Sequence, residues 1–169
     1  MKTIETILTR RSIRKYINKP VEKEKIDKML KAAMYAPSAR NYRPWQFIVV
    51  DERAKLDDLS ALHPYAKMLK EASLAIVVCG DLSIEKEEGY LAVNCSAATQ
   101  NILLAARDME LGSVWLGLYP RKPRMKDVQK YFSLPGHILP ISLVAIGYPY
   151  EEKSKPERFE EEKVHWNGW

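Results

Sequence analysis

A cluster of guanidinium groups near the start of the chain is the feature best suited to chemistry. Arg10, Arg11 and Arg14 surround the hydroxyl of Ser12 within five residues. Arginine stays charged and offers a planar fork of donors, so this spacing suits a phosphate clamp. Each charge-assisted contact of this kind contributes roughly 1.5–3 kcal/mol. The alternative is favourable charge at the end of a short helix, with the side chains solvated. Spacing alone leaves both interpretations open.

Two further segments could bring backbone close to a flat ligand. Residues 37–45, PSARNYRPW, hold small residues and an asparagine between two prolines, which predicts a stiff loop. Residues 113–117, SVWLG, end a predicted strand on a glycine, which permits close approach. Taken alone, each segment is more simply explained as an ordinary connection or an ordinary core strand.

Several other chemistries lack their residue patterns. Neither GxGxxG nor GxxxxGK[ST] is present, so no Rossmann or P-loop nucleotide site is indicated. No serine sits in a nucleophile elbow, and the three histidines lack the spacing of metal ligands: His63, His137 and His165. An acidic run is interpreted as a solvated face rather than a catalytic pair: Glu85, Glu87 and Glu88. A phosphate clamp without an evident acid, base or nucleophile predicts that a cofactor carries the chemistry.

Length and composition favour one soluble domain. The 169 residues are 46% apolar and 29% charged, which is ordinary for a globular protein with a core. No apolar run approaches the roughly 18 residues that span a bilayer, and the opening residues lack a signal peptide's apolar core. Cys79 and Cys95 have no CxxC spacing. These features predict a cytoplasmic protein with buried thiols, no metal and no membrane partner.

The net charge of +5 is concentrated at the start of the chain. Residues 1–31 hold ten Lys or Arg against four Asp or Glu, whereas residues 32–169 hold 17 against 18. The lysines at 23–31 are interpreted as the solvated side of a helix, which leaves the arginines to be explained. A nucleic-acid surface would use such charge, but no aromatic platform or recognition helix accompanies it. A small anionic ligand is favoured.

Hydrophobic periodicity predicts the elements that position these segments. Helices are expected at 3–10, 22–35, 52–61, 65–71, 90–110 and 123–131, and strands at 45–50, 74–79, 113–118 and 141–147. The order lacks a steady βαβ alternation, which argues for an α+β fold. The longest helix is apolar on more than one side, as in a core helix or a subunit interface. Gly112 is expected to end it in the left-handed conformation.

The end of the chain combines a polar stretch with two tryptophans. Residues 151–163 are almost entirely polar, but the last six residues read VHWNGW. Exposed indole rings lower solubility, so large apolar side chains at a terminus usually have a partner. We therefore expect the tail to dock, either on its own domain or on another subunit.

In combination, these segments resemble the nitroreductase family of flavoproteins in its short, single-domain form. The strongest marks are RRSIRKY at 10–16 and PSARNYRPWQF at 37–47, supported by NCSAATQNILLAA and LGSVWLG within 94–117, GYP at 147–149 and the ending VHWNGW. The resemblance covers essentially the whole chain, taken as one domain over 1–169. It implies an α+β fold with a central mixed, mostly antiparallel sheet flanked by helices. It also implies an intertwined homodimer, with residues 151–169 reaching the partner subunit.

The resemblance further implies which residues hold FMN. The cluster matches the positions that grip its phosphate and ribityl chain: Arg10, Arg11, Ser12 and Arg14. A loop that lies against the flavin from the second subunit is matched by Pro37, Ser38, Ala39 and Asn41. The strand-end amides that face N5 and O4 are matched by Leu116 and Gly117. A basic pair that closes on the phosphate is matched by Lys155 and Arg158. The family's Lys and Asn beside N1 and O2 have only Lys67 as a counterpart, because Pro64 and the local spacing depart from the pattern. The gating insertion of longer members is absent.

The implied activity is FMN-dependent oxidoreduction without a catalytic side chain. By resemblance, NADH or NADPH passes hydride to flavin N5 and leaves, and a nitroaromatic, quinone or related small acceptor then takes its place in a ping-pong sequence. Catalysis would be mainly orientation and electrostatics. A different donor, a specialised acceptor or a non-catalytic flavin-buffering role stay as alternatives, because the same clamp serves each of them.

Overall fold

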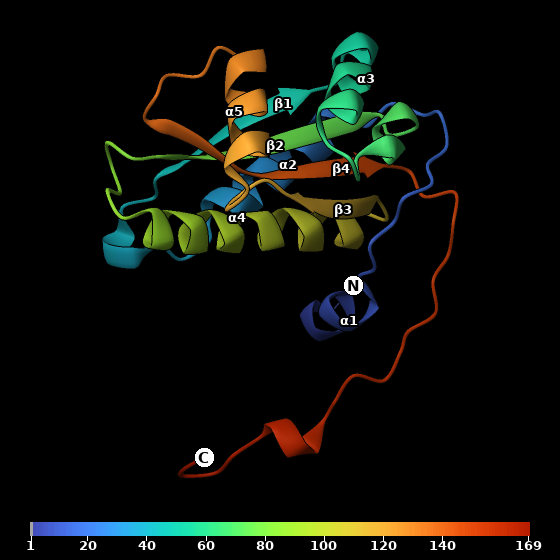
Figure 1. Cartoon of the computed structure of the whole chain (residues 1–169). Helices are drawn as coiled ribbons and strands as arrows, with labels where there is room; N and C mark the ends of the chain where they lie inside the picture. The colour runs from blue at the N-terminus through green and yellow to red at the C-terminus, as the bar shows by residue number, and fades with distance from the viewer. Residues whose placement is uncertain (1) are drawn as a thin grey trace.

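The computed structural model describes residues 2–169 and is built on a four-stranded antiparallel sheet (Figure 1). The spatial order is β1-β2-β4-β3, and the strands are β1 (Trp45–Val50), β2 (Leu74–Asp81), β3 (Gly112–Gly117) and β4 (Ile138–Gly147). The two central strands, β2 and β4, are buried almost throughout, as expected for strands covered on both faces. Within residues 2–169 the parallel contribution is a single isolated bridge, between Ser12 and Ser113.

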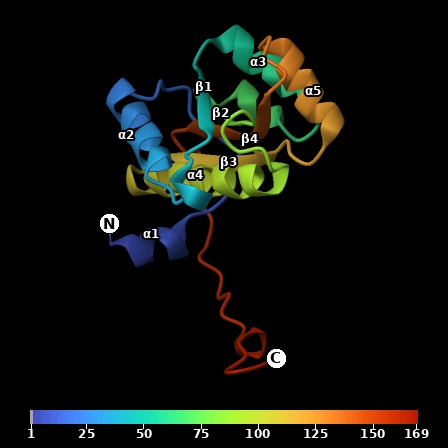
Figure 2. The same cartoon turned by 90° about the vertical axis from the view of Figure 1, so that its left-hand side faces the viewer.

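Helices cover both faces of the sheet (Figure 2). On one face, α2 (Lys23–Met34) packs against the long α4 (Glu88–Asp108). On the other face lie α3 (Arg53–Leu62) and α5 (Lys122–Tyr131), with the short 3-10 turn η2 (Lys67–Lys70) beside α3. No helix in the described chain is both long enough and apolar enough to traverse a membrane.

The observed bounds lie within three residues of those that periodicity predicts, but one turn prediction is wrong. Glu110, with φ of 63°, takes the left-handed position after α4, and Gly112 begins β3 instead. A Cβ on Gly112 would lie 2.8 Å from the side chain of Ile13. The glycine therefore permits close packing of the segment at 10–14 against β3, rather than forming the turn.

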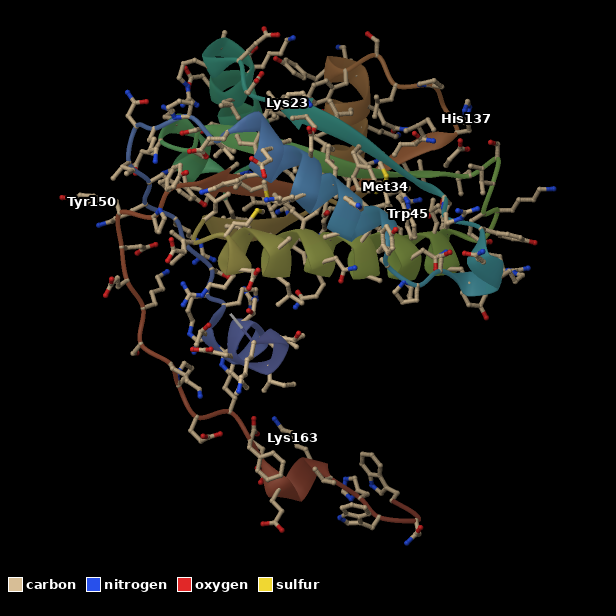
Figure 3. The ribbon with its side chains drawn as sticks, turned by 180° about the vertical axis from the view of Figure 1, so that it is seen from behind. Lys23, Met34, Trp45, His137, Tyr150 and Lys163 are labelled. Carbon is tan, nitrogen blue, oxygen red and sulfur yellow. The ribbon has the colours of Figure 1, made fainter. Side chains whose placement is uncertain are left out.

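Two terminal pieces project from this body: α1 (Thr3–Thr9), which contacts the end of α4 through Thr6, and the tail at 152–169 (Figures 1 and 2). The apolar side chains of α1 are largely exposed, Ile4 by 67%. The tail leaves the body after Tyr150, continues past Lys163 (Figure 3) and stays exposed along its whole length. Of the two expected docking sites of the tail, its own domain does not cover the tryptophans, because Trp166 and Trp169 are exposed. Docking on another subunit stays a prediction.

Candidate functional site

Two cavities border the segment from Arg10 to Arg14. The larger has a volume of about 790 Å³ and is lined by Arg14, by the end of β3 and by the start of α5. The smaller, of about 380 Å³, is lined by Arg10 and Arg11. The segment is held to the sheet by the N–H of Ile13, which donates to the carbonyl of Ser113 at 3.0 Å. Both volumes fall in the range of small-molecule sites.

The smaller cavity is lined by four basic residues, Arg10, Arg11, Arg107 and Lys153, and by three glutamates, of which Glu151 pairs with Lys153 at 3.3 Å. Burial lowers the pKa of Arg10, and the neighbouring charges of Arg11 and Arg158 lower it further. The ammonium group of Lys153 also lines this cavity and donates to the carbonyl of Ser12 at 2.7 Å. A lowered arginine pKa means that the folded protein holds this charge at a cost, which a bound anion would offset. The crowding therefore favours the phosphate interpretation for Arg10.

Arg11 behaves differently from Arg10. Its Nη1 donates to the carbonyl of Leu8 near the end of α1, and its Nε donates to the carbonyl of Ser154. The helix-end interpretation therefore holds in part for Arg11. Of the C-terminal basic pair, Arg158 lies close enough to influence Arg10, whereas Lys155 lines neither cavity.

The larger cavity brings together four of the residues singled out in the sequence. Arg14 and Lys67 supply positive charge, and the end of β3 supplies Leu116 and Gly117. Aromatic rings surround them, including those of Tyr65, Trp115 and Tyr119. No Asp, Glu or Cys of the described chain lines this cavity. Its lining suits a flat ring that carries or gains negative charge.

The backbone of Gly117 faces the open edge of the sheet. Amides along an antiparallel strand point alternately to its two edges. The N–H of Leu118 donates to Ile141 beside β4, so that of Gly117 belongs to the opposite edge. A Cβ at Gly117 would meet nothing closer than 4.0 Å. This edge can therefore present a backbone donor to a ligand in the larger cavity.

His63 fixes the carbonyl side of the same glycine. Its Nε2 lies 3.1 Å from the carbonyl oxygen of Gly117, and its Nδ1 accepts the N–H of Tyr65 at 3.2 Å. Because Nδ1 accepts, the proton lies on Nε2 and the ring is neutral. Burial lowers the pKa of His63; the bond to Gly117 opposes this effect and the charge of Arg124 adds to it. In the sequence, His63 was considered only as a metal ligand, because no local pattern shows that it would reach Gly117.

The lowered pKa predicts a loss of stability in mild acid. A buried neutral histidine stabilises the fold fully above its unfolded pKa of 6.5, and this contribution is lost as the pH falls through the folded pKa. We expect the urea midpoint of the protein to fall between pH 7.5 and pH 5.5, and His63→Gln to reduce that fall. Equal pH dependence of the two proteins would contradict the assignment.

The loop at 37–44 is held by the N-terminal half of α4. The N–H of Ala39 donates to Oδ1 of Asn94 at 2.9 Å, and the N–H of Asn41 donates to the carbonyl of Ser38 at 3.0 Å. The loop contains the 3-10 turn η1 (Ala39–Asn41). Asn94 is 3% exposed, and its Nδ2 has no hydrogen-bond partner within the described protomer. A buried donor without a partner is costly, so this half of the site is incomplete as it stands.

A buried carboxylate also supports this loop, which corrects one prediction. Glu85 is not part of a solvated face: it is 2% exposed, and its Oε1 accepts the N–H of Glu87. Its Oε2 lies 3.5 Å from Arg40, whose guanidinium also lies over the rings of Tyr42 and Tyr90. The acidic run was misread because its spacing did not show that Arg40 would pair with one of its members.

The two halves of the site lie at opposite ends of α4 (Figures 1 and 3). Asn94 holds the loop at 37–44, whereas Asp108, at the other end of the helix, accepts from Thr6 of α1 at 3.3 Å. These two helical residues are 14 positions apart, which is about 21 Å along the axis. Pro37, Ser38, Ala39 and Asn41 line neither cavity. One protomer therefore does not bring all the expected ligand residues together.

Comparison with known proteins identifies the fold. The family model described as "Nitroreductase family" matches residues 7–67 and 60–148. The chain belongs to the nitroreductase family. A protein of Methanothermobacter thermautotrophicus named "Putative NADH dehydrogenase/NAD(P)H nitroreductase" is 46% identical, over 100% of this chain and 88% of its own length.

Solved structures of this family share the architecture. An FMN-dependent nitroreductase of Clostridium difficile superposes with a TM-score of 0.91 at 37% identity, covering 98% of this chain and 99% of the other. A Desulfovibrio desulfuricans protein solved in complex with FMN superposes at 0.85 with 29% identity, covering 100% and 98%. The sequence resemblance to the nitroreductase family and the α+β fold are thereby confirmed.

Proposed function

We propose that this chain is an FMN-dependent oxidoreductase of the nitroreductase type, which takes electrons from NADH or NADPH and passes them to a nitroaromatic, quinone or related small acceptor. Relatives named as NAD(P)H nitroreductases and FMN-dependent nitroreductases support the activity. The observation that carries the proposal is geometric: one five-residue segment borders both a small cavity that contains Arg10 and Arg11 and a larger cavity with aromatic walls. A phosphate and a flat ring joined by a short chain match that arrangement.

The residues of both cavities fit FMN. Arg10, Arg11 and Lys153 would hold the phosphate, and its negative charge would offset the burial and the neighbouring cations that lower the pKa of Arg10. Arg14 and Lys67 would lie beside the ring, and the N–H of Gly117 would donate to its edge. Bound FMN supplies the two-electron chemistry that the side chains of the cavity do not offer.

The protein's own part is orientation and electrostatics. The cations beside the ring favour negative charge there without transferring a proton. His63 holds the end of β3 so that the amide of Gly117 keeps one direction. We propose that NAD(P)H and the acceptor use the larger cavity in turn, which is the ping-pong order. No side chain is assigned as an acid, base or nucleophile.

We further propose that the chain acts as a cytoplasmic homodimer in which residues 1–169 form one FMN-binding domain. A two-fold axis across α4 would bring the loop at 37–41 of one protomer beside the cavities of the other. The separation of the two half-sites along α4, the unpartnered Nδ2 of Asn94 and the exposed tail at 152–169 support this arrangement. The buried free thiols of Cys79 and Cys95 support a reducing compartment.

An absorption spectrum of the purified protein tests the activity. We expect a yellow protein, or one that quenches FMN fluorescence on titration, and bleaching of the flavin band by NAD(P)H under anaerobic conditions. Recovery of the band on adding a quinone or nitroaromatic would complete the cycle. FMN binding without acceptor-dependent NAD(P)H oxidation would instead identify a flavin-buffering protein, and absence of FMN binding would overturn the proposal.

A further inference from the structure

The larger cavity holds more positive charge than the proposed cofactor uses. Besides Arg14 and Lys67, it is lined by Arg121 and Arg124 at the start of α5. The phosphate of FMN has cations of its own in the smaller cavity. Two arginines of the larger cavity therefore remain without an assigned partner.

These two arginines lack the ion pairs that several basic side chains make elsewhere, such as Lys23 with Asp27 at 2.7 Å and Arg53 with Asp57 at 3.2 Å. Within residues 2–169, no carboxylate lies within 4.0 Å of Arg121 or Arg124. Even Lys122, which lies between them, reaches Glu88 at 2.9 Å. Arg121 and Arg124 therefore bring positive charge without an ion-pair partner to a cavity whose described lining holds no carboxylate.

Arg124 is oriented for binding. It is half-buried, its guanidinium carbon lies 5.5 Å from the centre of the Tyr65 ring, and its Nη1 lies 3.5 Å from the carbonyl of Gly117. A guanidinium has five donor hydrogens, so most of them stay available for another group. The aromatic neighbours Tyr65 and Tyr119 offer faces against which a second ring can stack.

We propose that Arg121 and Arg124 form an anion subsite that selects the reactant entering the larger cavity, by binding a carboxylate or phosphate attached to its ring system. The inference rests on the proposed function and names its substrate class: anionic aromatic acceptors, anionic nicotinamide donors, or both. Arg124 supplies a forked donor held near the strand end, and Arg121 adds an exposed charge to the same lining. Neutral reactants of the same shape would lack this contact.

A redox-inert ligand pair tests the subsite in the FMN-loaded protein. Benzoate and benzamide have nearly the same shape and differ in charge, and their binding can be followed by flavin absorbance or tryptophan fluorescence. We expect benzoate to bind at least about tenfold more tightly than benzamide, and higher salt to reduce that ratio. Arg124→Gln and Arg121→Gln should each lower the ratio. Lys126→Gln is the matched control, because Lys126 lies exposed on the same helix outside the cavity lining.

Two comparisons with reacting ligands then determine whether the electron donor or the acceptor carries the negative charge that the subsite binds. Flavin bleaching by NADH is compared with bleaching by the neutral donor 1-benzyl-1,4-dihydronicotinamide. Acceptor turnover is compared for 4-nitrobenzoate and 4-nitrobenzyl alcohol. If Arg124→Gln or Arg121→Gln slows the reaction of the anionic reactant of a pair more than that of the neutral one, the subsite is supported. The pair that shows this effect identifies which reactant uses the subsite.

Three results would overturn the inference. These are no preference for benzoate, a preference that survives both arginine substitutions, and a preference that Lys126→Gln reduces equally. Arg121 is exposed and makes no side-chain contact that holds the fold, so its variant stays informative if Arg124→Gln misfolds. FMN binding is measured first. If the protein binds FMN but does not prefer the anion, only the subsite is contradicted. If it does not bind FMN, the proposed function is contradicted as well.

Discussion

Arg10→Gln is expected to raise the dissociation constant of FMN by about 10- to 150-fold, because one charge-assisted phosphate contact contributes roughly 1.5–3 kcal/mol. The same substitution should leave the cofactor-free protein as stable as before or more stable. Burial and two neighbouring cations already make the charge of Arg10 unfavourable in the folded chain, as its lowered pKa indicates. Fluorescence titration of FMN and thermal unfolding without FMN measure the two effects.

The contrast between affinity and stability separates the two interpretations of the arginine cluster. If Arg10 only contributed favourable charge at the end of α1, its removal would destabilise the cofactor-free protein and change FMN affinity little. Lys15→Gln is a suitable control, because Lys15 is exposed, follows the cluster directly and lines neither cavity. That control should bind FMN like the unchanged protein.

The second large effect concerns assembly. Val93 lies on the outward side of α4 and is 66% exposed in the protomer, so Val93→Glu should not disturb the fold. In a two-fold interface across α4 the substitution would bury two unpaired carboxylates, at a cost of several kcal/mol for each. We expect the dissociation constant of the dimer to rise by about 1,000-fold or more. FMN affinity should fall at the same time.

Sedimentation velocity and FMN titration on the same samples measure this coupling. Val93→Thr keeps the shape and adds no charge, so it should remain dimeric and bind FMN. A Val93→Glu protein that stays dimeric would place the interface elsewhere. A monomeric Val93→Glu protein that binds FMN with unchanged affinity would show that one protomer is sufficient for the site.

The sequence predicted the helices and strands because their periodicity is a local property, and the arginine cluster could be singled out for the same reason. Periodicity located α4 and the four strands, since burial of one face repeats along the chain at a fixed interval. The cluster at 10–14 could be recognised because its charges are adjacent in sequence. The smaller cavity is completed by residues distant in sequence, from the end of α4 and from the segment after β4 that includes Lys153.

The residues that were missed depend on contacts between distant segments. Nothing near His63 in sequence shows that it reaches Gly117, 54 residues away. Glu85 is buried and pairs with Arg40, which approaches it from another loop. Gly112 was assigned to a turn because glycine commonly follows a helix, whereas the side chain of Ile13 is what requires it. Pairings of this kind are fixed by tertiary packing, which local propensity does not encode.

The central claim is that each FMN site is assembled from two protomers, with the arginine segment of one and the 37–41 loop of the other. Subunit mixing tests it directly. Arg10→Gln weakens the arginine half of the site, and Asn41→Asp places a negative charge in the loop half. Asn41 has a left-handed backbone, with φ of 55°, which aspartate also tolerates. FMN binding is measured for each variant and for the two after dissociation and reassembly together, at a concentration where neither binds alone.

A shared site predicts that mixing restores binding to about a quarter of all sites, because half of the dimers are mixed and each mixed dimer regains one intact site. If the mixture, shown to contain mixed dimers, binds no more FMN than its parents, both halves belong to a single protomer and the account is contradicted.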